Sequence, residues 1–130
     1  MKRRWWIAIG IGYAAGIFAA SSLPLRGLSL STSGLDKLIH ATEYALFFFI
    51  IRKAAPGRAW IPLAIAILYA GSDELHQAFV PGRHAGIDDF AADLAGIGLM
   101  AALIAFFQRC TLLARIGQRI LAYVISRKED

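Results

Sequence analysis

The sequence predicts an all-α integral membrane protein, with a four-helix transmembrane bundle and a C-terminal amphipathic helix at the interface. Three observations support this fold class. The 130 residues are 58% hydrophobic and 18% charged, with a mean hydropathy of +0.56, whereas soluble domains usually carry about 25% charged residues. The apolar residues fall in runs as long as a bilayer core requires. Helices are expected because short open strands cannot satisfy their backbone in lipid.

Four apolar segments define the predicted spans, namely residues 5–23, 35–51, 60–80 and 90–107. As helices they would be roughly 25–31 Å long, which suits a bilayer core. Turns are predicted where Pro56 and Gly57, and then Pro81 and Gly82, interrupt the apolar runs. The first segment follows a basic start, as in a signal peptide, but its length and the three later spans favour a retained span.

The C-terminal segment, residues 111–126, has a different pattern. Apolar side chains recur there at helical spacing and arginines occupy other faces, which is typical of an amphipathic helix on the anionic inner leaflet. We therefore divide the chain into a four-span membrane domain, residues 1–108, and an amphipathic cytoplasmic tail, residues 109–130. The residues that define this pattern are Leu112, Leu113, Arg115, Ile116, Arg119 and Ile120.

The distribution of lysine and arginine predicts the orientation. Positive residues favour the cytoplasmic side of a membrane protein, and this chain has eleven of them on one side and three on the other, so both termini are expected in the cytoplasm. The three on the outer side are Arg26, Lys37 and Arg83. The eleven are Lys2, Arg3, Arg4, Arg52, Lys53, Arg58, Arg109, Arg115, Arg119, Arg127 and Lys128.

Ionisable residues gather in the middle of the chain, where all three histidines and seven of the nine carboxylates lie between Asp36 and Asp93. An ionisable side chain at the centre of a bilayer costs at least a few kcal/mol, so it usually has a partner and a function. In the predicted topology these residues meet at the extracytoplasmic ends of spans two, three and four.

The second span begins with a stripe formed by Asp36, His40 and Tyr44, which are spaced four residues apart. Glu43 borders this stripe, three residues after His40. A carboxylate one turn from a histidine orients the ring and raises its basicity, or the two side chains act as metal ligands. For Asp36 a simple cap at the start of the helix is an equally good explanation.

The third and fourth spans supply the other polar groups. Asp73 shares a helix face with His76 and Gln77, and Glu74 lies about 100° away, while Asp89 and Asp93 are one turn apart. Bonding between neighbouring helices is the structural alternative. Small residues, Ala92, Gly96 and Gly98, allow another helix to approach the fourth span, and Gly12 and Gly16 suggest a packing face on the first.

Arg83 follows the Pro81–Gly82 turn. Its guanidinium is suited either to pairing with the aspartates or to binding an anionic headgroup, and interface anchoring is the alternative.

These blocks in this order resemble the VanZ-like membrane proteins, named for an accessory protein of glycopeptide resistance that affects teicoplanin. The resemblance covers roughly residues 5–108. It implies a small multi-pass protein of the bacterial cytoplasmic membrane that is linked to the cell envelope. Many members have Asn where this chain has Asp93. The matching motif residues are Asp36, His40, Glu74, Gln77, Arg83, Asp89, Asp93 and Gly96.

Three functions fit this pattern. The first is an enzyme, a hydrolase or transferase acting on lipid headgroups, with acid–base chemistry from a histidine–carboxylate pair. Tyr44, Gln77 and Arg83 would bind substrate, and His40, Glu74 and Asp89 are the candidate ligands of a divalent metal cofactor. The candidate catalytic residues are Asp36, His40, Asp73, Glu74, His76, Asp89 and Asp93.

The second function is binding of a phospholipid, a drug or a lipid-linked cell-wall precursor without turnover, with an effect on glycopeptide susceptibility. The third is a proton-coupled carrier, which is disfavoured because no ionisable relay crosses to the cytoplasm. The expected partners are membrane lipids. Nucleic acid is not expected, since the net charge of +5 lies at segment ends.

Overall fold

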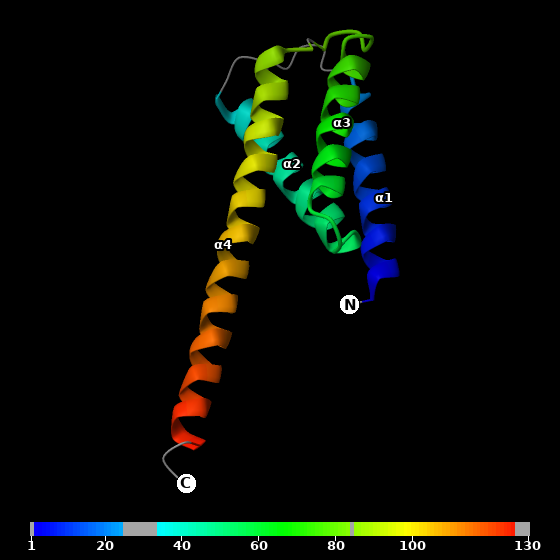
Figure 1. Cartoon of the computed structure of the whole chain (residues 1–130). Helices are drawn as coiled ribbons and strands as arrows, with labels where there is room; N and C mark the ends of the chain where they lie inside the picture. The colour runs from blue at the N-terminus through cyan, green and yellow to red at the C-terminus, as the bar shows by residue number, and fades with distance from the viewer. Residues whose placement is uncertain (1, 25–33, 84, 127–130) are drawn as a thin grey trace. The chain divides into compact units, whose positions relative to one another are not determined.

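The structure, a computed structural model, describes residues 2–24, 34–83 and 85–126, except the side chains of residues 122, 124 and 126. These residues form four α-helices and no strand: α1 (Arg3–Ser21), α2 (Gly34–Ala54), α3 (Trp60–Gln77) and α4 (Ile87–Ser126) (Figure 1). The prediction of an all-α fold is confirmed. Arg26, His84, Arg127 and Lys128 lie outside the described residues.

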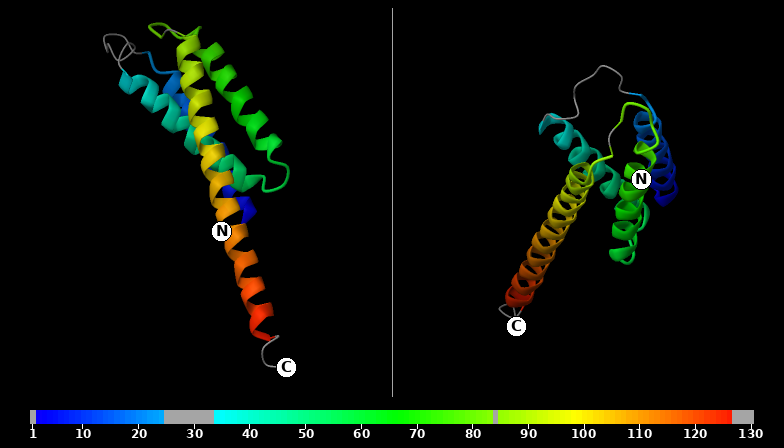
Figure 2. Two further views of the ribbon diagram at one scale, coloured as in Figure 1. Left: turned by 60° about the vertical axis from the view of Figure 1, so that its left-hand side comes forward. Right: turned by 90° about the horizontal axis from the view of Figure 1, so that it is seen from above.

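The chain divides into two compact units, Met1–Met100 and Ala101–Asp130. The first unit holds α1, α2, α3 and the beginning of α4, and in it successive helices run in opposite directions (Figures 1 and 2). Helices α1 and α3 therefore end where α2 and α4 begin. We call this the polar end of the first unit, because the buried ionisable side chains lie there.

Phe47 of α2 is at the centre of the core of the first unit. Its ring packs against Tyr44, against Tyr13 of α1 and against Tyr69 of α3, at ring-centre distances of 6.1, 6.2 and 5.0 Å. The Tyr69 hydroxyl donates to the Ala14 carbonyl at 2.6 Å. These aromatic contacts bind the first three helices together and leave the polar groups to the end of the bundle.

Helices α2 and α3 differ from their predicted spans at their C-terminal ends. Helix α2 continues to Ala54, because Arg52 and Lys53 interact favourably with the C-terminal dipole. Helix α3 ends at Gln77, three residues before the predicted end, because Pro81 disfavours helical geometry at Val80.

Helix α4 continues through residues 108–110, where the sequence suggested a boundary between a span and a separate tail. It is one helix of 40 residues. No proline or glycine occurs between Phe107 and Thr111, so nothing there interrupts the hydrogen-bond ladder. The tail residues Leu112, Leu113, Ile116 and Ile120 are all exposed.

Gly96 permits the close approach of α4 to α2. A Cβ atom at this position would overlap the backbone carbonyl of Ala41, whereas one at Gly98 would meet no atom within 4 Å. The packing prediction is therefore right for Gly96 and wrong for Gly98. Gly12 and Gly16 are likewise exposed with open space around them, so they form no packing face within the described residues.

Among the described residues, one segment, Ile87–Leu121 in α4, is long and apolar enough to cross a membrane by length and composition. Within the described residues, α1, α2 and α3 contain no such segment. This criterion does not confirm the predicted four-span bundle.

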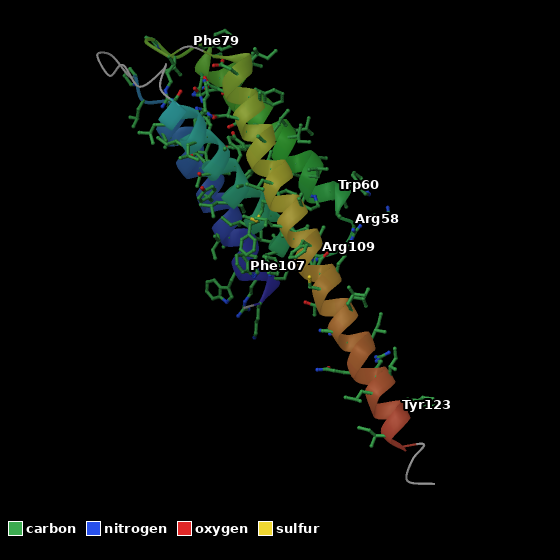
Figure 3. All side chains as sticks on the ribbon, turned by 90° about the vertical axis from the view of Figure 1, so that its left-hand side faces the viewer. Arg58, Trp60, Phe79, Phe107, Arg109 and Tyr123 are labelled. Carbon is green, nitrogen blue, oxygen red and sulfur yellow. The ribbon has the colours of Figure 1, made fainter. Side chains whose placement is uncertain are left out.

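The first unit combines an apolar core with exposed large apolar residues and buried polar ones. Large apolar residues are exposed, among them Ile11, Trp60, Leu68 and Phe79. Figure 3 shows Trp60 near the start of α3 and Phe79 just beyond its end, at the polar end. The buried polar side chains are Ser21, His40, Asp73, Glu74, Gln77, Asp89 and Asp93.

Candidate functional site

A buried polar contact at the polar end joins α2 to α4. His40 Nδ1 lies 3.0 Å from Asp93 Oδ1, and both side chains are buried. The Gly96 contact with Ala41 brings these two residues together, since each lies within one helical turn of it. An ionised carboxylate only accepts hydrogen bonds, so Nδ1 carries the proton whenever Asp93 is charged.

Glu74 of α3 is the third member of this group. Its Oε2 accepts a hydrogen bond from the Gly86 backbone N–H at 3.1 Å, which fixes the carboxylate just before α4 begins. A Cβ atom at Gly86 would overlap the Asp88 carboxylate, so glycine suits this position. Donor atoms of His40, Glu74 and Asp93 all lie within 4.8 Å of one another. We call these three residues the buried triad.

Four buried oxygen atoms near the triad have no hydrogen-bond partner among the described residues. They are Tyr44 Oη, Asp73 Oδ1, Glu74 Oε1 and Asp93 Oδ2. Buried polar atoms in folded proteins are nearly always paired with protein, water or a ligand. Four such atoms at one end of a helix bundle indicate a site that accepts a polar partner.

Lys37 also lies at the polar end. The sequence analysis counted this residue among the outer cationic residues but did not include it in the candidate site. Its Nζ forms ion pairs with Asp89 and, at 2.7 Å, with Asp88, and it lies 3.9 Å from Asp36. Asp36, His40 and Asp89 also bring donor atoms within 4.8 Å of one another. The Lys37 ammonium group, however, already lies against the carboxylates of this second group.

Arg83 is oriented by a tight turn, in which its backbone N–H donates to the Val80 carbonyl at 3.1 Å and Gly82 adopts a φ of 85°. Its guanidinium donates to the Ala20 carbonyl at 2.7 Å and to Gln77 Oε1 at 3.3 Å. Cationic groups are favourable at a helix C-terminus such as that of α1.

Gln77 links Arg83 to Asp73. Its Nε2 donates to Asp73 Oδ2 at 2.9 Å, so the arginine reaches this aspartate through an amide. Both Gln77 and Asp73 are buried. The three residues form a chain from the surface of the polar end towards the triad.

His76 lies on another side of α3. Its Nε2 is 2.9 Å from Ser22 Oγ, and its ring stacks on Phe18 of α1 at 4.5 Å between centres. The structure therefore separates His76 from the buried triad, although the sequence placed both histidines in one site. His76 contacts α1 and Ser22 just beyond it, whereas Glu74 contacts the Gly86 backbone just before α4.

A groove between α3 and the start of α4 leads to Glu74. Its volume is about 350 Å³, and Glu74 supplies the one ionisable side chain among its described lining residues. This groove could not be found from sequence, because it depends on how residues 85–87 approach α3. Its lining residues are Gly71, Glu74, Leu75, Ala78, Ala85, Gly86, Ile87 and Phe90.

Comparison with known proteins agrees with the resemblance seen in the motifs. The family model VanZ/LLP1 matches residues 3–108 of the chain. No curated protein matches the chain, and no solved structure does so either. The matched residues include the buried triad, Lys37, Arg83 and the groove.

Proposed function

The chain belongs to the VanZ/LLP1 family, and from this premise we propose that it is a multi-pass membrane protein that binds the headgroup of an anionic envelope lipid at its polar end. The headgroup would lie at the buried triad and an acyl or prenyl chain would lie in the groove. A phospholipid and a lipid-linked cell-wall precursor share the required chemistry, since each joins an apolar chain to a phosphate-bearing head.

The two ends of the first unit support the membrane part of this proposal. All three tryptophans, Trp5, Trp6 and Trp60, lie at the starts of α1 and α3, opposite the polar end. Tryptophan is enriched at membrane–water interfaces. Between Trp60 and Phe79 the chain is about as long as a bilayer core is thick.

Charge supports the direction in which the polar end faces. Among the described residues of the first unit, the lysines and arginines at the polar end are Lys37 and Arg83. Six lie at the opposite end, and by the positive-inside rule this excess supports a cytoplasmic location for that end. The polar end would then meet the outer leaflet. The six are Lys2, Arg3, Arg4, Arg52, Lys53 and Arg58.

The groove at Glu74 is the observation that carries the proposal. The apolar groove lies next to a carboxylate whose Oε1 is buried and has no hydrogen-bond partner among the described residues. An amphiphile satisfies both surfaces together, because its chain fills the channel and its head reaches the polar atoms. A small polar metabolite would leave the channel unfilled.

Substitution of two leucines on α3 tests this proposal. Leu75 lines the groove and is 64% exposed, whereas Leu68, two turns away on the same face, is 73% exposed and lies outside the groove. We expect Leu75→Trp to fill the channel and remove lipid that copurifies with the protein, measured by native mass spectrometry. Leu68→Trp should retain it. Equal lipid retention by both variants would contradict the proposal.

Catalytic turnover is a second candidate function, favoured by the His40–Asp93 contact of 3.0 Å. A histidine oriented by a carboxylate is suited to moving a proton during attack at a headgroup phosphate or ester. His40→Ala would then abolish a change in envelope lipid composition that the wild-type protein produces. If lipid composition is the same in cells with the wild-type protein and with this variant, the binding function stands alone.

A further inference from the structure

We propose that the buried triad is a divalent metal site, with one imidazole nitrogen of His40 and one carboxylate oxygen each from Glu74 and Asp93 as ligands. The ligand set is new in composition, because sequence reasoning selected Asp89 in the place that Asp93 takes in the structure. The existence of the site depends only on these side chains. Its role towards a headgroup rests on the proposed function.

The geometry of the triad is one that could hold a metal ion. The donor atoms come from three helices, α2, α3 and α4, and all lie within 4.8 Å of one another. His40 Nδ1 and Asp93 Oδ1 are 3.0 Å apart. Two adjacent ligands of an octahedral ion, each at 2.0–2.1 Å, are also roughly 3 Å apart. An ion therefore fits between them in place of the shared proton.

Unsatisfied oxygen atoms provide independent support. Asp93 is completely buried and Glu74 is 8% exposed, and each has one carboxylate oxygen without a partner among the described residues. A buried carboxylate that accepts only one hydrogen bond is costly unless a cation compensates its charge. In an ion-bound state, both carboxylates would gain that compensation.

The second group of candidate ligands, Asp36, His40 and Asp89, is the weaker site. Lys37 Nζ pairs with Asp89 and lies close to Asp36, so an ion there would compete with an ammonium group that is already present. The buried triad has no lysine or arginine among its described hydrogen-bond and ion-pair partners. This contrast selects Asp93 over Asp89 as a ligand.

The ligand types indicate an ion of the Mn²⁺, Fe²⁺ or Zn²⁺ class. Imidazole favours first-row transition metals, and two carboxylates favour harder ions within that range. Three protein ligands leave coordination positions open, as in catalytic sites and substrate-bridging sites. A phosphate oxygen is a suitable ligand for such a position.

A metal ion also resolves the charge balance of the polar end. Acidic residues outnumber the cationic ones there, and Lys37 and Arg83 already pair with protein groups. An anionic headgroup near Glu74 and Asp93 would otherwise meet like charges. A bridging divalent ion converts this repulsion into attraction.

The test uses the full-length protein in detergent after removal of bound metal with a chelator. We expect Mn²⁺ alone to bind with a stoichiometry of one ion per chain. Pulsed electron paramagnetic resonance should then show coupling between Mn²⁺ and a histidine nitrogen. Absence of Mn²⁺ binding together with absence of Zn²⁺ binding would overturn the site. So would bound Mn²⁺ without nitrogen coupling. Both measurements, the stoichiometry and the nitrogen coupling, are made on the wild-type protein, so they do not require a variant to fold.

Variants identify the ligands. His40→Ala, Glu74→Gln and Asp93→Asn should each weaken Mn²⁺ binding at least about tenfold, because loss of a supporting residue alone typically costs this much. His76→Ala and Asp88→Asn remove an imidazole and a carboxylate outside the triad, and both should leave the affinity within about twofold of wild type. Equal losses in the two sets would contradict the assignment.

The role of the ion towards lipid is tested separately. Chelation should reduce lipid retention by the wild-type protein, and Mn²⁺ should restore it. Metal binding with lipid retention unaffected by chelator would keep the site and overturn its role at the headgroup. Metal binding by a protein that retains no lipid under any condition would contradict the proposed function alone.

Discussion

At the residue scale, Glu74 combines a structural role with the proposed binding role. One of its carboxylate oxygens has the structural role, and the other has the binding role. Oε2 is held by the Gly86 N–H, and Oε1 has no partner among the described residues. The first oxygen fixes the approach of the segment before α4 to α3. The second is available to a ligand.

This division predicts opposite effects for two substitutions. Without metal, Glu74→Gln keeps the acceptor for Gly86 and removes a charge near Asp93, so the free energy of unfolding should stay the same or rise. Glu74→Ala loses the acceptor and should be less stable than Glu74→Gln by about 1–3 kcal/mol. Thermal unfolding in detergent measures both. A Gln variant as unstable as the Ala variant would mean that the charge itself stabilises the fold.

Arg83 is a second residue whose role the structure specifies. Its guanidinium contacts the carbonyl of Ala20 and the side chain of Gln77. Arg83→Ala should lower the free energy of unfolding by about 1–3 kcal/mol, and Arg83→Lys should recover only part of it because an ammonium lacks the planar fork. Arg58→Ala, at an exposed arginine in another turn, is the matched control and should unfold like the wild type.

Residue types and spacing predicted much of this site. Asp36, His40, Glu74, Asp89 and Asp93 were expected to meet at one end of the bundle, and donor atoms of all five enter one of the two groups described above. The helical spacing and the alternation of helix direction sufficed for that. Which aspartate faces His40 depends on the rotation of α4, and the sequence does not determine this.

At the element scale, the ends of the helices depend on whether residues that interrupt a helix are present. The boundaries predicted from the sequence did not follow these residues throughout. Pro81 shortened α3, and the absence of proline and glycine between Phe107 and Thr111 let α4 continue past the expected boundary. A change from strongly apolar to amphipathic sequence suggested a boundary there. Composition, however, does not interrupt a helix whose backbone hydrogen bonds continue.

The approach of α4 to α2 gives a prediction for this scale. Gly96→Ala would place a methyl group against the Ala41 carbonyl, so we expect a loss of about 1–3 kcal/mol in stability. Because this contact also positions His40 and Asp93, metal binding should weaken as well. Gly98→Ala has open space and should be neutral or slightly stabilising. Equal melting temperatures for the two variants would contradict the close approach.

At the scale of the whole molecule, the separation of charge and tryptophan between the two ends of the first unit predicts its orientation. Ile87 is 88% exposed at the polar end, and Gly57 lies in the turn at the opposite end. In a Cys110→Ser background, an impermeant thiol reagent applied to intact cells should label Ile87→Cys and spare Gly57→Cys. The reverse pattern would place the polar end in the cytoplasm.

The most direct test of the central claim is an experimental density map of the protein purified in native lipid. The account predicts an ordered amphiphile with its headgroup at His40, Glu74 and Asp93 and its chain along Leu75 and Phe90. The map should also show a peak for an ion between the headgroup and the three side chains. A map in which the groove holds no lipid, while ordered lipid lies only on the outer surfaces of the helices, would contradict the account.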